Sequence, residues 1–418
     1  MLRFIHAADI HLDSPMRGLP NYPGAPIEEI RAATRRALEA LVNLATEDNV
    51  DLVLIAGDLY DGDWRDYNTG LFLAAQMTRL REAGIEVVIA SGNHDAASQI
   101  TRHLKLPDNV RRLSTKHPES VVFEEFGAVV HGQGFSERHV LTNVTRDYPQ
   151  VSPDLFNIGM LHTSAGLAGH DEYAPCSKQD LLARGYQYWA LGHIHRYEVL
   201  SSDPWILFPG NLQGRHIRET GPKGCIVVTV ENDKATVERR DLAVVRWELC
   251  RVSSVDCHDV YELIECVGCQ LETLLDECPA PTLATRIVIA DASPARNALL
   301  AEPERWLNEA RLMATDVGAG RIWLEKLEIE PTADNLPVLA KSFADTSALA
   351  ALQTMDLNPD SIAALCNDTA LRDLVSKVPR ELLEQAQCPE VCEETLSRIV
   401  PQARAMLLAS LQARGEDA

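Results

Sequence analysis

The sequence predicts an α/β protein with a large first domain, a small second α/β domain and a helical C-terminal region. Strand-like and helix-like segments alternate from the first residue to about residue 245. After Asp241 the pattern restarts as strand, helix, strand, helix, strand, and after Pro331 it becomes helical with repeated prolines. We therefore expect one domain over residues 1–245, a second over 246–330 and a helical region over 331–418.

The composition limits the class of protein. The chain has 418 residues, 46% of them hydrophobic, which is enough for a large core. The formal net charge of −22 argues against non-specific binding of nucleic acid through bulk charge, because contacts to phosphate need local Lys or Arg. A polyanionic substrate would have to meet a local basic patch, metal ions or a second subunit.

The cysteines and the apolar runs indicate a cytoplasmic protein. Ten cysteines in a chain that starts with a strand-like segment rather than an export signal read as reduced thiols. No apolar run approaches the ~20 residues of a membrane span, so we expect no membrane association. Cys266 and Cys269 have the spacing of half a zinc site, but without a second pair we interpret them as buried apolar residues of a helix, and Cys388 and Cys392 likewise.

In the first domain, helices are predicted where Ala, Leu, Glu and Arg are frequent, at Pro26–Asn49 and Leu71–Ala83. Short runs rich in aliphatic residues predict strands. The strand-like runs are Leu2–Ala8, Leu52–Ile55, Ile85–Ala90, Ala128–His131, Ile158–Leu161, Tyr188–Leu191, Trp205–Pro209, Cys225–Val230 and Ala235–Arg240.

In the second domain, strands and helices are predicted to alternate. The segments, in order, are Arg246–Val252, Val260–Glu277, Thr285–Ala290, Pro303–Met313 and Arg321–Ile329.

Polar residues with metal-binding side chains follow five of the strands. The clearest case is Asp58, directly after the apolar run that ends at Gly57. One such Asp is more often a helix cap or a turn residue, but ligands collect at the carboxyl ends of parallel strands, and five such ends predict one shared pocket. The candidate ligands are Asp9, His11, Asp58, Asn93, His162, His193 and His195.

These residue types suit two divalent metal ions. A carboxylate such as Asp58 bridges two ions well, because each oxygen can face a different ion. Asp9 and His11 are two residues apart and project to the same side of an extended segment, as do His193 and His195 unless a turn separates them. Carboxylate, amide and imidazole ligands without thiolate favour manganese, iron or zinc over calcium.

The motif series D-x-H, G-D-x-x-D, G-N-H-D, H and G-H-x-H, present here in that order, resembles the calcineurin-like metallophosphoesterase superfamily. The resemblance implies a β-sandwich flanked by helices. It also implies one ion bound by Asp9, His11, Asp58 and His195, and a second bound by Asp58, Asn93, His162 and His193. His94 matches the histidine that protonates the leaving oxygen. We expect Asp61 and Asp95 to orient the histidines, although Asp95 is equally suited to cap a helix.

The segments around Asp9 and Asp58, together with Asp13-Ser14-Pro15 and the run 62–70, resemble the SbcD-like DNA repair exonucleases and within them the YhaO-type branch. This implies a DNA nuclease, exonuclease or endonuclease, with two Mn²⁺ per chain. It also implies a capping domain over 246–330, a tail that binds an SbcC-like coiled-coil ATPase, and allows a homodimer. The candidate DNA contacts, each as easily an ordinary surface residue, are Arg17, Arg65, Arg215, His216 and Arg218.

Two other functions are kept as alternatives. The first is a phosphoesterase acting on small nucleotides or phosphoproteins, and the second is a non-catalytic scaffold for the ATPase, against which the intact ligand set argues. In the tail, Leu396, Val400 and residues at 403, 407 and 411 form an apolar stripe on a helix. We expect this helix to pair with residues 378–386 or to pack on the second domain.

Overall fold

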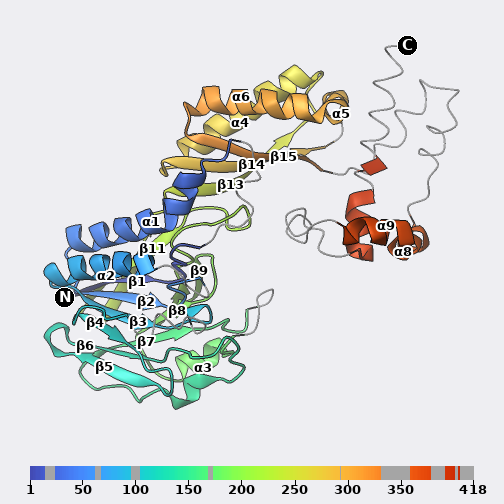
Figure 1. Cartoon of the computed structure of the whole chain (residues 1–418). Helices are drawn as coiled ribbons and strands as arrows, with labels where there is room; N and C mark the ends of the chain where they lie inside the picture. The colour runs from blue at the N-terminus through green and yellow to red at the C-terminus, as the bar shows by residue number, and fades with distance from the viewer. Residues whose placement is uncertain are drawn as a thin grey trace, which may run out of the picture. The chain divides into compact units, whose positions relative to one another are not determined.

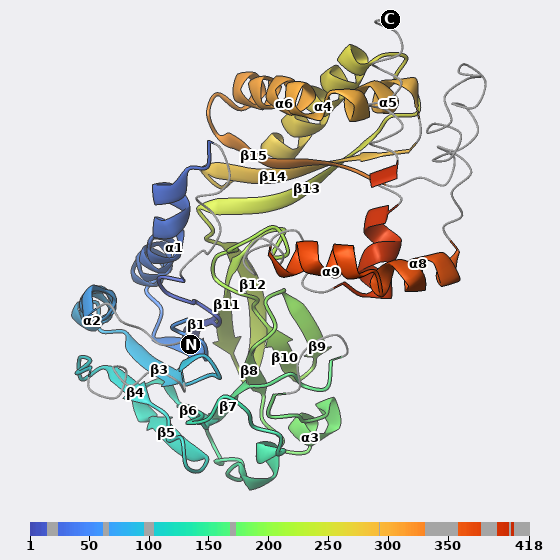
Figure 2. The ribbon, with the colours of Figure 1, turned by 45° about the vertical axis from the view of Figure 1, so that its right-hand side comes forward.

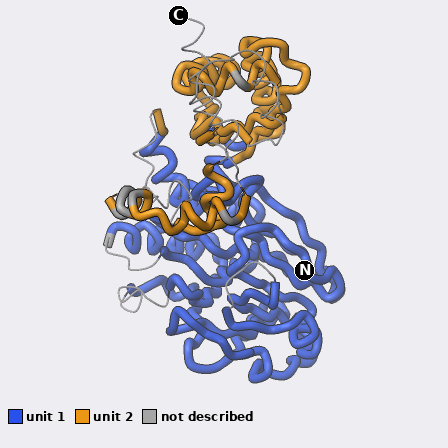
Figure 3. The backbone as a smooth tube through the Cα atoms, turned by 90° about the vertical axis from the view of Figure 1, so that its right-hand side faces the viewer, with its two compact units in different colours: residues 1–16, 26–247, 280–282 blue, residues 17–25, 248–279, 283–418 orange. Residues whose placement is uncertain are grey.

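The computed structural model describes residues 1–14, 24–61, 67–95, 104–167, 173–291, 293–330, 358–377, 391–400 and 403–404. The chain separates into two compact units, drawn in different colours in Figure 3. The first consists of residues 1–16, 26–247 and 280–282. The second contains residues 248–279 and the chain from Leu283 onward.

The first unit contains a six-stranded sheet in the order β12-β11-β1-β2-β3-β4. Strands β1 to β4 run parallel, whereas β11 is antiparallel to β1 and to β12. The bounds are β1 Leu2–Ala7, β2 Leu52–Ala56, β3 Glu86–Ala90, β4 Val110–Arg112, β11 Gly224–Glu231 and β12 Lys234–Asp241.

A second six-stranded sheet has the order β5-β6-β7-β8-β10-β9. Its four central strands are parallel, and the two edge strands are antiparallel to their neighbours. The bounds are β5 Glu119–Phe123, β6 Ala128–Gly132, β7 Phe156–His162, β8 Tyr188–Gly192, β9 Glu198–Ser202 and β10 Trp205–Phe208.

The two sheets pack face to face, and the alternation of side chains along β2 shows why. Leu52 and Leu54 point into an apolar cluster shared with strands of the second sheet, whereas Val53 and Ile55 point to the opposite face. There they pack against helices α1, Ile27–Glu47, and α2, Tyr67–Glu82, which cover that face in Figure 1. Both faces of β2 are therefore buried, and the expected β-sandwich flanked by helices is confirmed.

The outer face of the second sheet carries its own apolar cluster, in which Trp189 and Phe208 are fully buried with Tyr148 and Tyr186. The short helix α3, Lys178–Leu182, starts at a capping box in which Ser177 and Asp180 exchange side-chain and backbone hydrogen bonds. Two 3₁₀ turns, η3 at Glu124–Phe126 and η4 at Val144–Asp147, connect strands in this half.

The parallel strands bring their carboxyl ends to one edge of the sandwich. After β1 the Asp9 amide donates to the Gly57 carbonyl at 3.0 Å, and the His11 amide donates to the Asp58 carbonyl at 3.0 Å. The second sheet comes close at the same edge, because a Cβ on Gly192 would overlap the carbonyl oxygen of Ala56. Residues that follow strands of both sheets are thus held together.

In the second unit, strands β13, β14 and β15 form a three-stranded sheet in that order, with β14 and β15 parallel. Figure 2 shows helices α4 and α6 on one side of it. The bounds are β13 Val245–Ser253, α4 Val260–Asp276, β14 Thr282–Ala290, α5 Pro294–Ala301, α6 Pro303–Gly318 and β15 Ile322–Ile329.

The order of elements in this unit was predicted from the sequence, but α5 was not. Ser293 caps α5 by accepting a hydrogen bond from the Arg296 amide, and Pro294 is the first residue of the helix. The apolar residues that follow show too weak a helical period to predict the helix from the sequence. α6 runs to Gly318, beyond the predicted end at Met313, because a left-handed residue, Ala319, closes it only there.

The prediction that Cys266, Cys269 and Cys392 are buried is wrong, since all three are exposed, and Cys388 lies outside the described residues. The α4 helix buries its other face through Leu263, Val267 and Leu271. The two cysteines of α4 therefore fall outside the apolar stripe.

The tail contains helices α8, Pro359–Cys366, and α9, Thr369–Ser376, and a helical stretch within 391–400. Leu396 of the predicted apolar stripe is buried against Ile362 and Cys366 of α8, with Val400 beside them. The contact with α8 was not predicted. Of the two expected partners, residues 378–386 lie outside the described residues, and packing on the second domain stays a prediction. Within the described chain, no helix combines the length and apolar character required to cross a membrane.

Candidate metal centre

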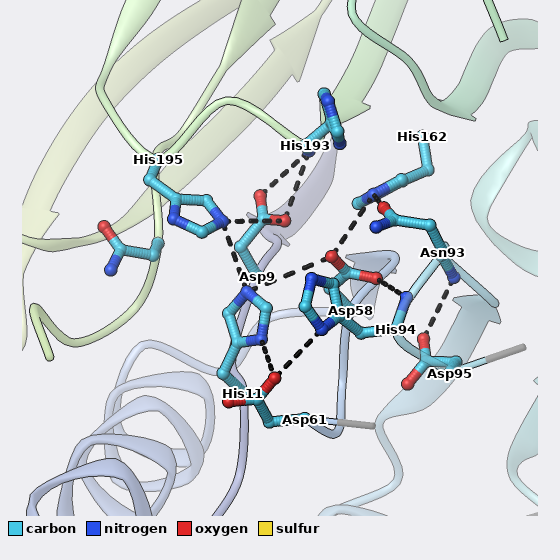
Figure 4. Close-up of polar contacts among 12 residues, drawn as sticks. Asp9, His11, Asp58, Asp61, Asn93, His94, Asp95, His162, His193 and His195 are labelled. Carbon is cyan, nitrogen blue, oxygen red and sulfur yellow. Dashed lines mark hydrogen bonds and ion pairs between the residues drawn. The ribbon is translucent and has the colours of Figure 1, made fainter. Parts of the chain in front are cut away.

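The seven residues predicted as metal ligands meet where the strands of the two sheets end (Figure 4). Asp9 follows β1, Asp58 follows β2 and Asn93 follows β3, whereas His162 ends β7 and His193 follows β8. Asp9, Asp58 and His162 offer ligand atoms that lie within 4.8 Å of one another, and so do Asp9, His11 and His195. The sequence prediction thus identified residues that the fold brings to one place.

His11 and His195 face each other with an Nε2–Nε2 distance of 3.2 Å. The His195 Nε2 lies 3.7 Å from an Asp9 oxygen, and the His11 Nε2 lies 3.9 Å from an Asp58 oxygen. Two imidazole nitrogens and two carboxylates therefore converge on one small volume, a donor set that suits a divalent cation.

His195 is oriented by a residue that was not predicted. Its Nδ1 donates to Oε1 of Glu219 at 2.8 Å, so Nε2, which lies 3.7 Å from an Asp9 oxygen, is the nitrogen left to bind a metal ion. Asp9 itself is fixed by the backbone N–H of His193, which donates to both its oxygens at 3.0 and 3.2 Å. No motif marks Glu219 in the sequence, since it is 24 residues from His195.

His162 is held in the same way by the backbone. Its Nδ1 donates to the Ala56 carbonyl at 2.9 Å, so Nε2 is the nitrogen that faces the site. That Nε2 lies 2.9 Å from Asn93 Oδ1 and 3.4 Å from an oxygen of Asp58. The ring of His193 packs edge-on to His162 and stacks on Tyr173, at ring-centroid distances of 5.2 and 5.6 Å.

The charges at the site favour a cation. Burial alone would raise the pKa of the Asp58 carboxyl, but the nearby imidazole of His162 and its hydrogen bond hold that pKa well below its ordinary value. Burial would lower the pKa of His162, yet the charges of Asp58 and Asp9 raise it to about 9. A field that favours a proton on a buried imidazole equally favours a metal ion in its place.

Four candidate ligands have backbone φ angles that side chains rarely adopt. The φ values are 50° for Asp9, 46° for His11, 50° for Asp58 and 106° for His193. Such residues cost of order 1–3 kcal/mol each and persist where the surroundings hold them in place. For Asp9, His11 and Asp58 the backbone hydrogen bonds between the β1 and β2 loops provide that restraint, and the His193 N–H is held by the Asp9 carboxylate.

Gly57 supplies a testable consequence of this close packing. Its φ is +94° and a Cβ there would overlap Nδ1 of His162, so Gly57→Ala is expected to displace His162, lower metal content and reduce thermal stability. Gly84→Ala is the matched control, because Gly84 has a φ of +74° but open space around its Cβ position. Both variants place an alanine at a positive φ, but only Gly57→Ala also pushes against His162. Melting curves and elemental analysis of both variants measure the difference, and equal metal content in the two would contradict the expectation.

His94 lies beside the ligands. Its Nδ1 is 2.9 Å from Asp61 Oδ1, and its backbone N–H donates to Asp58 Oδ1 at 2.9 Å. Asp61 also accepts from Ser14 Oγ at 2.6 Å. The hydrogen bond to Asp61 raises the pKa of His94, the direction that a proton donor at this position needs.

Asp61 orients a histidine, as the sequence predicted, but Asp95 does not. The Asp95 carboxylate is buried and accepts from three backbone N–H groups, those of Leu59, Tyr60 and Gly92, at 3.2, 2.9 and 3.0 Å. It therefore holds the loops after β2 and β3 together rather than touching an imidazole. The alternative of a helix cap concerns residues 96–103, which lie outside the described chain.

Of the predicted DNA contacts, Arg17 and Arg65 lie outside the described residues. His216 and Arg218 are exposed on the loop after β10, as a contact to a backbone phosphate requires. Arg215 is largely buried, with its side chain only 13% exposed, and is paired with carboxylates. The DNA contact stays a prediction for all five, and Arg215 is the least accessible of the three described.

Comparisons with known proteins agree with this geometry. Residues 2–197 match the family model described as calcineurin-like phosphoesterase, and residues 247–332 match the middle domain of the metallophosphoesterase YhaO. The uncharacterized metallophosphoesterase YhaO of Bacillus subtilis (strain 168) is 36% identical over 313 residues, which cover 74% of this chain and 76% of that protein.

Two further similarities are more distant. A DNA double-strand break repair protein Mre11 of Methanopyrus kandleri is 24% identical over 372 residues, covering 81% of this chain and 70% of that protein. A dimetal phosphatase from Danio rerio is 12% identical with a TM-score of 0.38, covering 58% of this chain and 96% of that one, a likeness too slight to carry an argument.

The sandwich and its ligand-bearing edge thus define a metal-dependent phosphoesterase, a hydrolase of the calcineurin-like class. Within that class, the chain belongs to the YhaO family of metallophosphoesterases.

Proposed function

We propose that the chain is a manganese-dependent DNA nuclease of the SbcD-like type, which hydrolyses phosphodiesters with two ions and acts in cytoplasmic DNA repair beside a coiled-coil ATPase. The observation that carries the hydrolytic part is the separation of roles at one edge of the sandwich. The Nε2 atoms of His11, His162 and His195 lie close to the carboxylates and would bind metal. His94 lies beside this group, with its Nδ1 2.9 Å from Asp61, and would supply a proton.

The donor set fits two divalent ions. One ion would be held by Asp9, His11, Asp58 and His195, and the other by Asp58, Asn93, His162 and His193. The tautomers fixed by Glu219 and by the Ala56 carbonyl leave the facing Nε2 atoms of His195 and His162 available as ligands. The ligands are oxygen and imidazole nitrogen, and manganese suits such a set.

When bound, the two ions would neutralise the phosphate and make an attacking water more acidic. The residues of the chain supply the rest. Asp58 lies between the two groups of ligands, and its Oδ1 also accepts the His94 backbone N–H, which ties the position of the acid to this carboxylate. His94, with a side chain 40% exposed, is accessible to substrate and donates its proton to the departing sugar oxygen.

DNA is proposed as the substrate because relatives that cover most of this chain are described as DNA double-strand break repair proteins. The alternative is a phosphoesterase for small nucleotides or phosphoproteins. Cleavage of duplex DNA, cyclic nucleotides and an aryl phosphodiester with added manganese tests the choice. We expect DNA to be cut from its ends, and cleavage of cyclic nucleotides without cleavage of DNA would support the alternative.

The tail is proposed to bind the ATPase. Leu396 and Ile362 belong to a small apolar cluster formed by tail residues, and helices of this kind can lie along a partner helix. We expect a chain ending near Pro331 to remain folded and to cleave an aryl phosphodiester with manganese, but to lose co-purification with an SbcC-like ATPase. Full binding of the ATPase by the shortened chain, or its insolubility, would show that the tail serves the fold instead.

A further inference from the structure

The carboxylate of Glu219 gathers five donors from three residues, one of them Arg215 Nε at 3.3 Å. Its oxygens accept from His195 Nδ1 at 2.8 Å, from the Arg215 backbone N–H and Nη2 at 2.8 Å each, and from Asn211 Nδ2 at 2.9 Å. The side chain is 6% exposed. A buried carboxylate with this many donors is fixed in place, so the His195 imidazole that is hydrogen-bonded to it is fixed as well.

The fold explains why these residues meet. Strand β10 pairs in parallel with β8, with Trp205 opposite Tyr188 and Leu207 opposite Ala190. The loop after β8, which carries His195, and the loop after β10, which leads to Arg215, therefore leave the sheet at the same edge. A contact across 24 residues of sequence becomes a contact between neighbours in space.

Arg215 extends this arrangement to the other side of the centre. While Nη2 donates to Glu219, Nη1 lies 3.4 Å from Asp61 Oδ2. Asp61 in turn holds Nδ1 of His94 at 2.9 Å. One guanidinium thus lies between the carboxylate that orients His195 and the carboxylate that orients His94.

We infer that Arg215 and Glu219 are positioning residues that set the metal ligand His195 and the acid His94 in one geometry, an inference that rests on the proposed function for the role of His94. Arg215 acts through these two carboxylates and through its Nη2, which lies 3.4 Å from Nδ1 of His195, and it touches no reacting atom. Glu219 acts on the ligand by fixing which ring nitrogen carries the proton.

This role replaces a contact from Arg215 to the DNA backbone. A phosphate would have to compete with two carboxylates that already hold the guanidinium, and it would have to reach a side chain that is 13% exposed. Removing the guanidinium would leave Glu219 and Asp61 without their shared cation, and the loss of a partner from a buried ionic network is costly. His216 and Arg218, on the same loop and exposed, are better placed for phosphate.

The test uses the full chain with Glu219→Gln, Arg215→Ala and Arg215→Lys. Manganese affinity is measured by calorimetry, and kcat and KM are measured on an aryl phosphodiester and on duplex DNA. We expect Glu219→Gln to weaken manganese binding by about 10–100-fold, the usual effect of losing a partner that orients a ligand. We expect Arg215→Ala to lower kcat by a similar factor on both substrates, with KM for the small substrate almost unchanged.

Arg215→Lys serves if the alanine variant fails to fold. Because an ammonium lacks the planar fork that spans two carboxylates, we expect the lysine variant to fold but not to regain the wild-type kcat. The matched control is Arg305→Ala, which breaks another, exposed Arg–Glu pair, with Glu302 at the start of α6. The control should leave manganese affinity and kcat at wild-type values.

Two results would overturn the inference. Unchanged manganese affinity in Glu219→Gln would mean that His195 does not depend on Glu219. A rise confined to KM for duplex DNA in Arg215→Ala, with the small substrate unaffected, would mean that Arg215 contacts DNA. If the wild-type chain cleaves neither substrate, the proposed function fails, while the binding isotherms of the Glu219 variant still decide the positioning role.

Discussion

Replacing Asp58 by alanine is expected to empty both metal positions and to abolish phosphodiester cleavage. Asp58 is buried, and its Oδ2 lies 3.9 Å from His11 Nε2 and 3.4 Å from His162 Nε2, one imidazole from each proposed ion site. Without that charge, two divalent ions would repel each other with no anion between them. Elemental analysis for manganese measures the outcome directly.

The backbone at Asp58 calls for a second variant. Its φ is 50°, a conformation that Asn tolerates better than Ala, so Asp58→Asn removes the charge while keeping the local backbone. Asp108→Ala is a surface control, since that side chain is 87% exposed. Two manganese ions per chain in both Asp58 variants would refute the shared-ligand assignment.

The strand ends made much of the site predictable from the sequence. Asp9, Asp58 and His162 each follow or end an apolar run, and parallel strands bring such positions to one edge whatever the details of the loops. The order of elements in the second domain was predictable for a related reason, since the apolar period of α4 and the runs of β14 and β15 are strong. Local pattern was sufficient wherever the chain repeats a simple period.

What the sequence did not reveal depends on contacts between loops. Glu219 reaches His195 only because β10 lies beside β8. The order of strands in a sheet cannot be predicted from the residues of a single segment. Asp95 was expected near an imidazole, yet its carboxylate turns to backbone N–H groups of two loops. A D-x-H or G-N-H-D motif indicates which residues lie close to a site, but it does not indicate which hydrogen-bond partners each side chain has.

Replacing His94 by alanine should separate chemistry from metal binding. The ring reaches the centre from outside the ligand set, and its Nδ1 is engaged by Asp61 at 2.9 Å. Because the bond that His94 makes to Asp58 comes from its backbone N–H, the alanine variant keeps that bond and the position of the bridging carboxylate. We expect manganese content and melting temperature close to those of the wild type, while turnover falls by ~10²-fold or more.

The same reasoning gives the comparison that decides the role of His94. His117→Ala removes an exposed imidazole on the loop before β5 and should change nothing. Asp61→Asn should lower turnover less than His94→Ala, because it leaves the imidazole present but weakens the hydrogen bond that raises its pKa and holds its Nδ1.

A leaving group that departs readily without a proton, such as nitrophenolate, should reduce the loss of turnover that His94→Ala causes. An equal penalty on DNA and on such an ester would show that His94 does not protonate the leaving oxygen, and unchanged turnover on DNA would show that another group supplies the proton.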